Sequence, residues 1–255
     1  SFLAEDLWPT KGDYDFNDVV VDYRIHYVQN SSNKVKDLIL ETVVKANGGY
    51  QQNSMMMHLP VNPNLVEKVT GYQKFDSYLQ LAANGTELGQ SETVFIITDN
   101  LSKTLPPPTG ARVTNVLDVD QKVNPVNLTI KLTFVSPITK TLLGTAPYDP
   151  FVIPNLDRTR EIHLAGKTLT AKASASLLGT QDDASGKAGR PNFTTSTGLP
   201  WAIIISSSVP YAKEGVDFTL GYLKFSDWAS SKGALSTDWF QNKTNYRNTT
   251  KLYLK

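Results

Sequence analysis

The stretch VVVDYRIHYV, residues 19–28, decides the fold class. It is rich in β-branched and aromatic residues, and apolar side chains occupy every second position from Val19 to Tyr27. Asp22, Arg24 and His26 occupy the alternate positions. A period of two residues is typical of a strand with one face in the core and one in solvent. The sequence therefore predicts a half-buried β-strand here.

Similar patterns recur along the chain. LILETVVKA, residues 38–46, follows a polar turn at Asn30–Asn33, and we expect it to pair with the first strand as a hairpin. VNLTIKLTFVS, residues 126–136, alternates over its whole length. TVFIIT (93–98) and WAIIIS (201–206) are short apolar runs that suit buried strands.

Proline- and glycine-rich breaks separate these strands, at residues 60–63, 106–108, 144–150 and 179–191. Many short strands with such breaks predict an all-β fold, a jelly-roll-like β-sandwich of mostly antiparallel strands. Aromatic residues three positions apart within 218–232, followed by Gly233, predict a short C-terminal helix. We expect a single domain over residues 1–255, with a split into two lobes near 144–154 as the alternative.

Composition excludes several classes of protein. The chain carries 25 basic and 24 acidic residues, a formal net charge of +1, so no nucleic-acid or anionic-membrane surface is indicated. No apolar run approaches the roughly 20 residues that span a bilayer. Cysteine is absent, which excludes disulfides and thiolate sites and suits an exported bacterial protein. We expect any signal peptide or lipid anchor to lie upstream of Ser1.

A cluster of acidic residues precedes the first strand. Carboxylate and amide side chains alternate along GDYDFND, residues 12–18, two more carboxylates lie upstream, and Lys11 is the only nearby base. Calcium takes about six to eight oxygen ligands, which short Asp and Asn side chains on a tight loop can supply. The predicted Ca²⁺ ligands are Glu5, Asp6, Asp13, Asp15, Asn17 and Asp18.

The loop departs from the EF-hand. With Asp13 as the first position, the sixth is Asp18 where that loop needs Gly, and the twelfth is Arg24 where it needs Glu. The alternative to a metal site is an Asp/Asn-rich turn that caps the strand through side-chain to backbone hydrogen bonds. Transition metals fit less well, because no His or Cys lies close by in the sequence.

No catalytic motif is present. The three histidines stand in no spacing that hydrolytic or metal-dependent chemistry requires. We expect His26 on a solvated strand face, His58 in a packed strand after three Met residues, and His163 at an ordinary strand position. A glycosidase needs two carboxylates about 5 to 10 Å apart across a cleft. The candidates are Asp149, Asp157, Glu161, Asp182 and Asp183. We expect a non-enzymatic protein, with a glycan-active hydrolase as an alternative.

Aromatic residues raise the expectation of carbohydrate binding. The chain contains four Trp, eleven Tyr and ten Phe residues, and aromatic faces stack on sugar rings. The candidates for an exposed sugar-stacking face, in polar loop-like surroundings, are Trp8, Trp239, Tyr246 and Tyr253. For each of them, packing against the loops is the favoured alternative. Those expected in the core are Trp201 and Trp228.

Several motifs resemble the bacterial LruC-domain family. They begin with EDLWP at residues 5–9 and GDYDFNDVVVDYR at residues 12–24. Further matching stretches are YDPFVI (148–153), REIHL (160–164), LPWAI (199–203), YLKFSDWA (222–229), DWF (238–240) and YRN (246–248). The resemblance covers the chain from residue 5 to about residue 253.

The resemblance implies an exported, often lipid-anchored surface domain whose acidic motif binds calcium and whose function is adhesion or carbohydrate binding. The family's acidic run after L-F-G-T corresponds to LLGTQDDAS, residues 177–185, which keeps Asp182 and Asp183 but has Ala184 at a third acidic position. The candidate ligand-binding residues are therefore Trp8, Trp239, Tyr246, Asp182 and Asp183. We expect a secreted or outer-membrane surface module that recognises a glycan, with a protein-contacting adhesion or structural module as the alternative.

Overall fold

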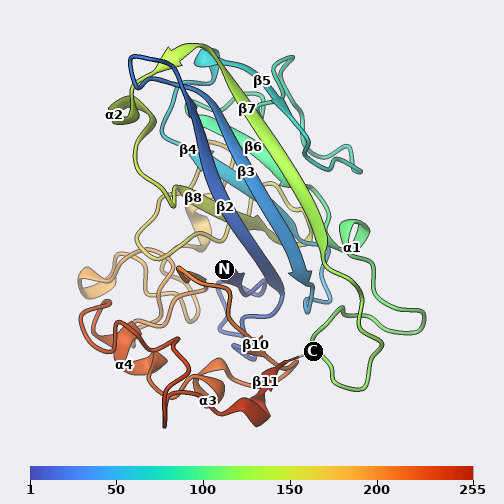
Figure 1. Cartoon of the computed structure of the whole chain (residues 1–255). Coiled ribbons are helices and arrows are strands. Elements are labelled where there is room, and N and C mark those ends of the chain that lie inside the picture. The colour runs from blue at the N-terminus through green and yellow to red at the C-terminus, as the bar shows by residue number, and fades with distance from the viewer. Residues whose placement is uncertain (255) are drawn as a thin grey trace.

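The computed structural model describes residues 1–254 and shows a sandwich of antiparallel sheets (Figure 1). The six-stranded sheet contains, in spatial order, β5 (Val66–Thr70), β7 (Val126–Ile138), β3 (Val35–Ala46), β2 (Val19–Gln29), β1 (Phe2–Ala4) and β9 (Ala202–Ile204). The three-stranded sheet contains β6 (Thr93–Thr98), β4 (Ser54–Leu59) and β8 (Asp149–Ile153). A third sheet pairs β10 (Tyr211–Ala212) with β11 (Leu252–Tyr253). The predicted all-β sandwich is confirmed.

The predicted hairpin is formed by β2 and β3. They pair antiparallel from Val20↔Ala46 to Gln29↔Val35, and Asn33 at the turn adopts a left-handed φ of 57°. Side chains on one face of β2 pack into or against the main core, and Arg24, His26 and Val28 on the other face are exposed, as the alternation predicts. At the start of the strand, Val20 on that other face is buried in a second core. β7 shows the same alternation and pairs with the other side of β3.

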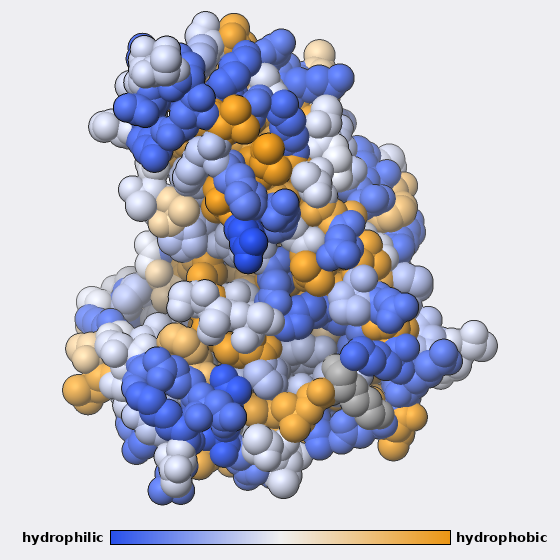
Figure 2. All heavy atoms as spheres, in the orientation of Figure 1, coloured by the Kyte–Doolittle hydropathy of each residue, from blue (hydrophilic) through white to orange (hydrophobic). Residues whose placement is uncertain are grey.

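The main core lies between the two large sheets. On β4, Met55 and Met57 enter this core, whereas Met56 packs in a smaller apolar cluster on the opposite face. The run of three Met residues is therefore strand packing, as predicted. On the face seen in Figure 2, hydrophobic residues are scattered among hydrophilic ones, and a hollow lies at the left between the hairpin end and the loops below.

The helices are short. They are α1 (Leu101–Thr104), α2 (Lys140–Leu143), α3 (Phe218–Gly221) and α4 (Phe225–Ser230), with 3-10 turns at Pro63–Leu65, Pro154–Leu156, Ala175–Leu177, Lys187–Gly189 and Thr249–Lys251. The helix predicted over 218–232 is thus two helices. It breaks because Tyr222 forms an isolated β-bridge with Arg247, and the Leu223 N–H donates to the carbonyl of Tyr246 at 2.9 Å.

A second core lies at the C-terminal end of the chain, below the sandwich in Figure 1. It is built largely from aromatic side chains of α3, α4 and the segment around Trp239, whose rings pack edge to face. The boundary considered near 144–154 falls on β8, which pairs with β4. The single-domain organisation stays a prediction. Within residues 1–254, no helix is long and apolar enough to cross a membrane.

Candidate metal centre

Strand β1 brings the N-terminal acids to the start of β2. Its register, Ala4↔Val19, places Glu5 and Asp6 opposite the residues that precede β2. The Asp6 N–H donates to Asp18 Oδ2 at 2.8 Å, and the Glu5 N–H donates to the Trp201 carbonyl at 2.9 Å. Sheet pairing therefore holds both acids against the loop that follows them in sequence.

Aromatic anchors fix the loop itself. Tyr14 and Phe16 adopt left-handed φ angles of 63° and 56°, a conformation that costs L-residues roughly 1–2 kcal/mol each. Both side chains are fully buried in the C-terminal core, where the Phe16 ring lies 5.1 Å from that of Phe218. The Phe218 N–H donates to the Tyr14 carbonyl at 2.8 Å. Packing of the aromatic residues compensates the backbone strain and sets the course of the acidic loop.

Three carboxylates converge beside the anchored loop. Glu5, Asp13 and Asp15 each offer one oxygen, and these oxygens lie within 4.8 Å of one another. Glu5 and Asp15 are buried, and Asp13 is exposed at the rim. Glu5 Oε1 accepts the Phe16 N–H at 2.5 Å, but Glu5 Oε2 is buried without any hydrogen-bond partner. A buried carboxylate oxygen without a partner is the feature that a bound cation would satisfy.

Nearby bases do not offset the burial of the cluster: the charge of Arg160 favours the ionised form of Asp6, but burial still raises the pKa of Asp6. Burial, and then the charge of Asp15, raises the pKa of Glu5 well above its usual range. Burial, and then the charge of Asp13, raises the pKa of Asp15 to about 8. Lys11 Nζ is engaged by Asp217 Oδ2 at 2.9 Å. The protein thus disfavours the ionised carboxylates unless a cation joins them.

The remaining predicted ligands surround the three carboxylates. Asp6 Oδ2 accepts from Asn53 Nδ2 at 2.8 Å, and Asp18 accepts the Asp6 N–H. Burial raises the pKa of both Asp6 and Asp18. Asn17 is buried, and its side-chain amide donates to the Ala212 carbonyl at 3.2 Å. These three side chains border the cluster and are already used in part by the fold.

Sequence reasoning missed one acid. Glu214 has a buried Oε2 without a hydrogen-bond partner, and burial, then Asp13 and Asp6, raises its pKa to about 7. The neighbouring Gly215 N–H donates to Asp15 Oδ2 at 2.9 Å, which ties this segment to the loop. No local motif marks Glu214, since it lies about 200 residues from the loop.

Most of the aromatic residues considered for a sugar site are packed, which is the alternative that the sequence favours for each of them. Trp8, Trp239 and Tyr253 are buried, at 0%, 2% and 3% exposure, because each packs into one of the cores instead of reaching solvent. Tyr246 is half-buried. Conversely, Trp228, expected in the core, is half-buried and lines a surface hollow.

The acids of the second loop have different surroundings. Asp182 is exposed and accepts the Lys11 N–H at 2.9 Å. Asp183 is buried, and its oxygens accept from Gly179 N–H and the Ser185 hydroxyl at 2.9 and 2.8 Å. Both line a hollow of about 350 Å³, together with Lys11, Lys187, Ser196 and Thr197. The second loop therefore contributes a polar surface hollow next to the acidic loop.

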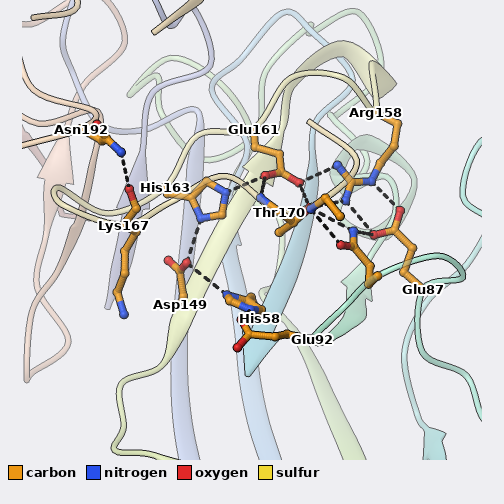
Figure 3. A network of polar contacts seen from close by, with 12 residues as sticks. His58, Glu87, Glu92, Asp149, Arg158, Glu161, His163, Lys167, Thr170 and Asn192 are labelled. Atoms are coloured by element: carbon orange, nitrogen blue, oxygen red, sulfur yellow. Dashed lines mark hydrogen bonds and ion pairs between the residues drawn. The ribbon is translucent and has the colours of Figure 1, made fainter. Parts of the chain in front are cut away.

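His163 is the centre of a buried charge network, not an ordinary strand residue (Figure 3). Its Nδ1 lies 2.9 Å from Asp149 Oδ2, and its Nε2 lies 2.9 Å from Glu161 Oε2. Arg158 extends the network, with Nη1 2.6 Å from Glu161 and Nε 2.5 Å from Glu87. The prediction failed although Glu161 and His163 share the REIHL stretch, because the sequence does not show that both side chains are buried or that Asp149 on β8 faces them.

The network stabilises its own charges. Burial alone would lower the pKa of His163, but Asp149 and Glu161 raise it to about 9. Burial alone would raise the pKa of Glu161, but His163 and Arg158 lower it to about 2. Two carboxylates considered for a hydrolase are thereby bridged by a buried imidazolium and do not face a cleft. His58 lies beside Glu92 at 2.7 Å, and His26 is exposed as predicted.

Comparison with known proteins identifies a family of undefined function. The family model described as "Domain of unknown function (DUF4842)" matches residues 33–240. The chain is also similar to a Bacteroides ovatus protein described as a "Putative lipoprotein", whose crystal structure was determined at 2.08 Å resolution. The identity is 17%, the TM-score is 0.69, and the match covers 99% of this chain and 75% of that one. This likeness shows the fold alone. No curated protein shows significant sequence similarity to the chain.

Proposed function

The chain belongs to the family described as Domain of unknown function (DUF4842), and we propose that it is a non-catalytic, calcium-binding module of an exported surface protein. One observation carries the proposal: the buried Glu5 Oε2 has no hydrogen-bond partner and belongs to the group of three converging carboxylates. The family itself has no assigned activity, so the site has to support the function.

The chemistry of the site favours calcium over other metals. Its donors are all oxygens, and calcium prefers such ligands in a flexible shell of about six to eight. Glu5, Asp13 and Asp15 form the centre of the proposed shell. Glu214, with its own unpartnered buried oxygen, is an additional ligand in the proposal. Zinc and copper prefer imidazole or thiolate ligands, and the chain contains no cysteine.

The proposed role of the metal is structural. Glu5 follows β1, Asp13 and Asp15 belong to the loop before β2, and Gly215, which donates to Asp15, precedes α3. A cation bound here would connect the large sheet to the C-terminal aromatic core. Because the cluster exists only in the folded chain, binding would raise stability by mass action.

Calorimetry and thermal melting test the proposal. Calcium added to chelator-treated protein should bind saturably and raise the melting temperature, and Asp13→Asn, at the exposed rim, should weaken that binding at least about tenfold, since charge-assisted contacts are the strong ones. Glu41→Gln, an exposed acid on β3, is the matched control and should bind calcium like the wild type. A melting temperature that is unchanged by both calcium and chelator would refute the proposal.

Export and the absence of catalysis are parts of the same proposal. The LruC-domain resemblance supports a lipid-anchored or secreted location, and assignment to that family stays a proposal. The family match indicates no catalytic family. The bridging of Asp149 and Glu161 by His163 further supports a non-catalytic module.

Carbohydrate recognition is the second candidate function. The polar hollow beside the acidic loop favours it, because hydroxyl, carboxylate and ammonium groups gather there around about 350 Å³. Such groups match the hydroxyls of a sugar. A glycan array should show saturable binding that Asp182→Ala and Thr197→Val both weaken. A blank array, or binding indifferent to both changes, would leave the protein-contacting alternative in its place.

A further inference from the structure

Strand β9 forms a free edge of the six-stranded sheet. It pairs with β1 on one side only, in the register Phe2↔Ile204 and Ala4↔Ala202. Next to the strand, the Ile205 N–H donates to the Ser1 carbonyl at 2.8 Å, so odd-numbered residues direct their polar groups toward β1. The N–H and C=O groups of Ala202 and Ile204 therefore point away from β1. Among residues 1–254, no strand pairs with that side.

An apolar groove runs along this edge. It has a volume of about 320 Å³ and is lined by β9 residues together with Leu164, Pro191, Pro200 and Trp228. Trp228 is held firmly, because its ring packs 5.6 Å from Phe225 and 5.7 Å from Trp239. The groove is thus a preformed, largely apolar surface beside unpaired backbone groups, a combination that soluble proteins normally avoid at sheet edges.

Two cations lie in the same groove. Arg190 and Lys232 both line it, and in the part of the chain that the structure describes neither side chain forms an ion pair. The nearest acid on α4, Asp227, lies 3.7 Å from Lys224 instead. Unpaired cations beside an apolar groove complement a ligand that combines apolar and acidic groups.

We infer that the β9 edge binds an extended segment of a partner protein, with apolar residues at its centre and an acidic residue beside them. Such a segment adds a strand through the outward groups of Ala202 and Ile204, places an apolar side chain against Trp228, and meets Arg190 and Lys232 with its carboxylate. The apolar lining and free backbone groups favour a peptide over a sugar at this site. The inference does not depend on the calcium site.

Selection of peptides tests the inference. Random short peptides displayed on phage, selected on the full chain with calcium present, should yield sequences with an apolar centre and an acidic flank. Binding of a representative, acetyl-Glu-Val-Leu-Val-Glu-amide, is then followed by fluorescence. Ile204→Pro removes an outward N–H and also replaces an apolar side chain that lines the groove, so it should weaken binding about fivefold or more, the equivalent of at least one hydrogen bond. Lys232→Glu should weaken it further and shift selection away from acidic peptides.

Controls separate this inference from loss of folding and from self-association. Ile204→Val keeps the N–H and should bind like the wild type, with the wild-type calcium response and melting temperature. Trp228→Ala removes a ring that packs on Phe225 and Trp239, so its binding is measured well below its own, lower melting temperature. Trp228→Ala should weaken binding even if Ile204→Pro fails to fold. Failure to select any peptide, or binding unaffected by both changes, overturns the inference. Concentration-dependent dimerisation that Ile204→Pro abolishes would also overturn it, because the edge would then belong to a second copy.

Discussion

Two regions of the molecule bury carboxylates, and they differ in where the compensating positive charge comes from. In the network around His163, Arg158 and the imidazole lie within 2.5–2.9 Å of their carboxylate partners. In the acidic cluster, Glu5 and Asp15 are equally buried, but the nearest lysine is engaged by Asp217. The pKa shifts follow this difference: the pKa of Glu161 is lowered to about 2, whereas the pKa of Asp15 is raised to about 8.

The direction of the pKa shift separates an ion network that is complete within the chain from a cluster that lacks a counter-charge. Burial opposes ionisation in both regions, so the direction of the pKa shift depends on whether the chain supplies a counter-charge. Around His163 it does, and the carboxylates stay ionised. Around Glu5 it does not, and the proposed calcium ion would be the missing partner. Removing one carboxylate should therefore have opposite consequences in the two regions.

The largest expected effect is on the network. Glu161→Gln removes a charge whose oxygens accept from His163, Arg158 and Thr170, so buried donors lose their acceptor. We expect the free energy of unfolding to fall by about 3–5 kcal/mol, as when one partner of a buried ion pair is removed. Chemical denaturation measures the effect, which should be the same with calcium and with chelator.

The matched control is Glu92→Gln, because Glu92 is half-exposed and contacts only the outer histidine, His58. Its cost should stay below about 1 kcal/mol, the usual range for exposed pairs. Equal losses of unfolding free energy for the two variants would mean that the buried Glu161 contributes no more to stability than the half-exposed Glu92.

In the acidic cluster, the effect of the corresponding Glu→Gln substitution on stability should change sign when calcium is added. Glu5→Gln keeps the acceptor for the Phe16 N–H, and its amide replaces an oxygen that has no partner. In chelator the variant should be at least as stable as the wild type, because a buried repulsion is removed. Calcium at a hundred times its Kd should stabilise the wild type by about 2.7 kcal/mol over its calcium-free form, so that it becomes more stable than the variant by up to that amount. Thermal melting of both proteins in chelator and in calcium measures the effect. If Glu5→Gln has the same order of stability relative to the wild type under both conditions, the cluster does not bind calcium as proposed.

The long strands were predictable from sequence because, over most of their length, only one face of each strand packs in the core. Alternation along β2 and β7 reports directly which side chains enter the core. β1 escaped prediction because three residues are too few to show a period. Yet β1 brings Glu5 beside the loop, so the geometry of the site depends on the element that sequence reasoning missed.

The parts of the site that are distant in sequence were not predictable. The spacing of Asp13 and Asp15 predicts a cation loop, but no local pattern marks Glu214, which tertiary packing places near Asp13. Burial of Trp8 and Trp239 agrees with the packed alternative that the sequence favoured, although polar neighbours in sequence do not show which side of a loop faces a core. The role of His163 was not predictable, because alternation along a short stretch does not show that Glu161 and Asp149 are buried against it.

The pH dependence of stability tests whether His163 is charged in the folded protein. The pKa of His163 is raised from 6.5 to about 9 in the folded protein, so its contribution is fully present below pH 6.5 and is lost as pH rises through 9. Between pH 7 and 9 the loss should be about 2 kcal/mol. The measurement is the difference in unfolding free energy between wild type and His163→Gln, because tyrosines and amines also titrate at high pH.

That difference should narrow steadily from pH 7 to pH 9, with calcium or without it. A difference that stays constant over this range would show that His163 is neutral in the folded protein, and the internal counter-charge would then be absent. On the acid side, Glu161 should protect stability until pH falls below its unfolded pKa near 4.5 toward about 2.

Substitution of Asp182 should have the smallest effect and tests whether this residue belongs to the acidic cluster. Asp182 is exposed, accepts the Lys11 N–H, and lies outside the group of three converging carboxylates. Asp182→Asn keeps an acceptor for that N–H and removes only a solvated charge, so stability should change by less than about 0.5 kcal/mol. Calorimetry should give an unchanged calcium affinity. A loss of affinity comparable to that of Asp13→Asn would extend the site to the second loop, and the cation would then connect the two acidic loops directly.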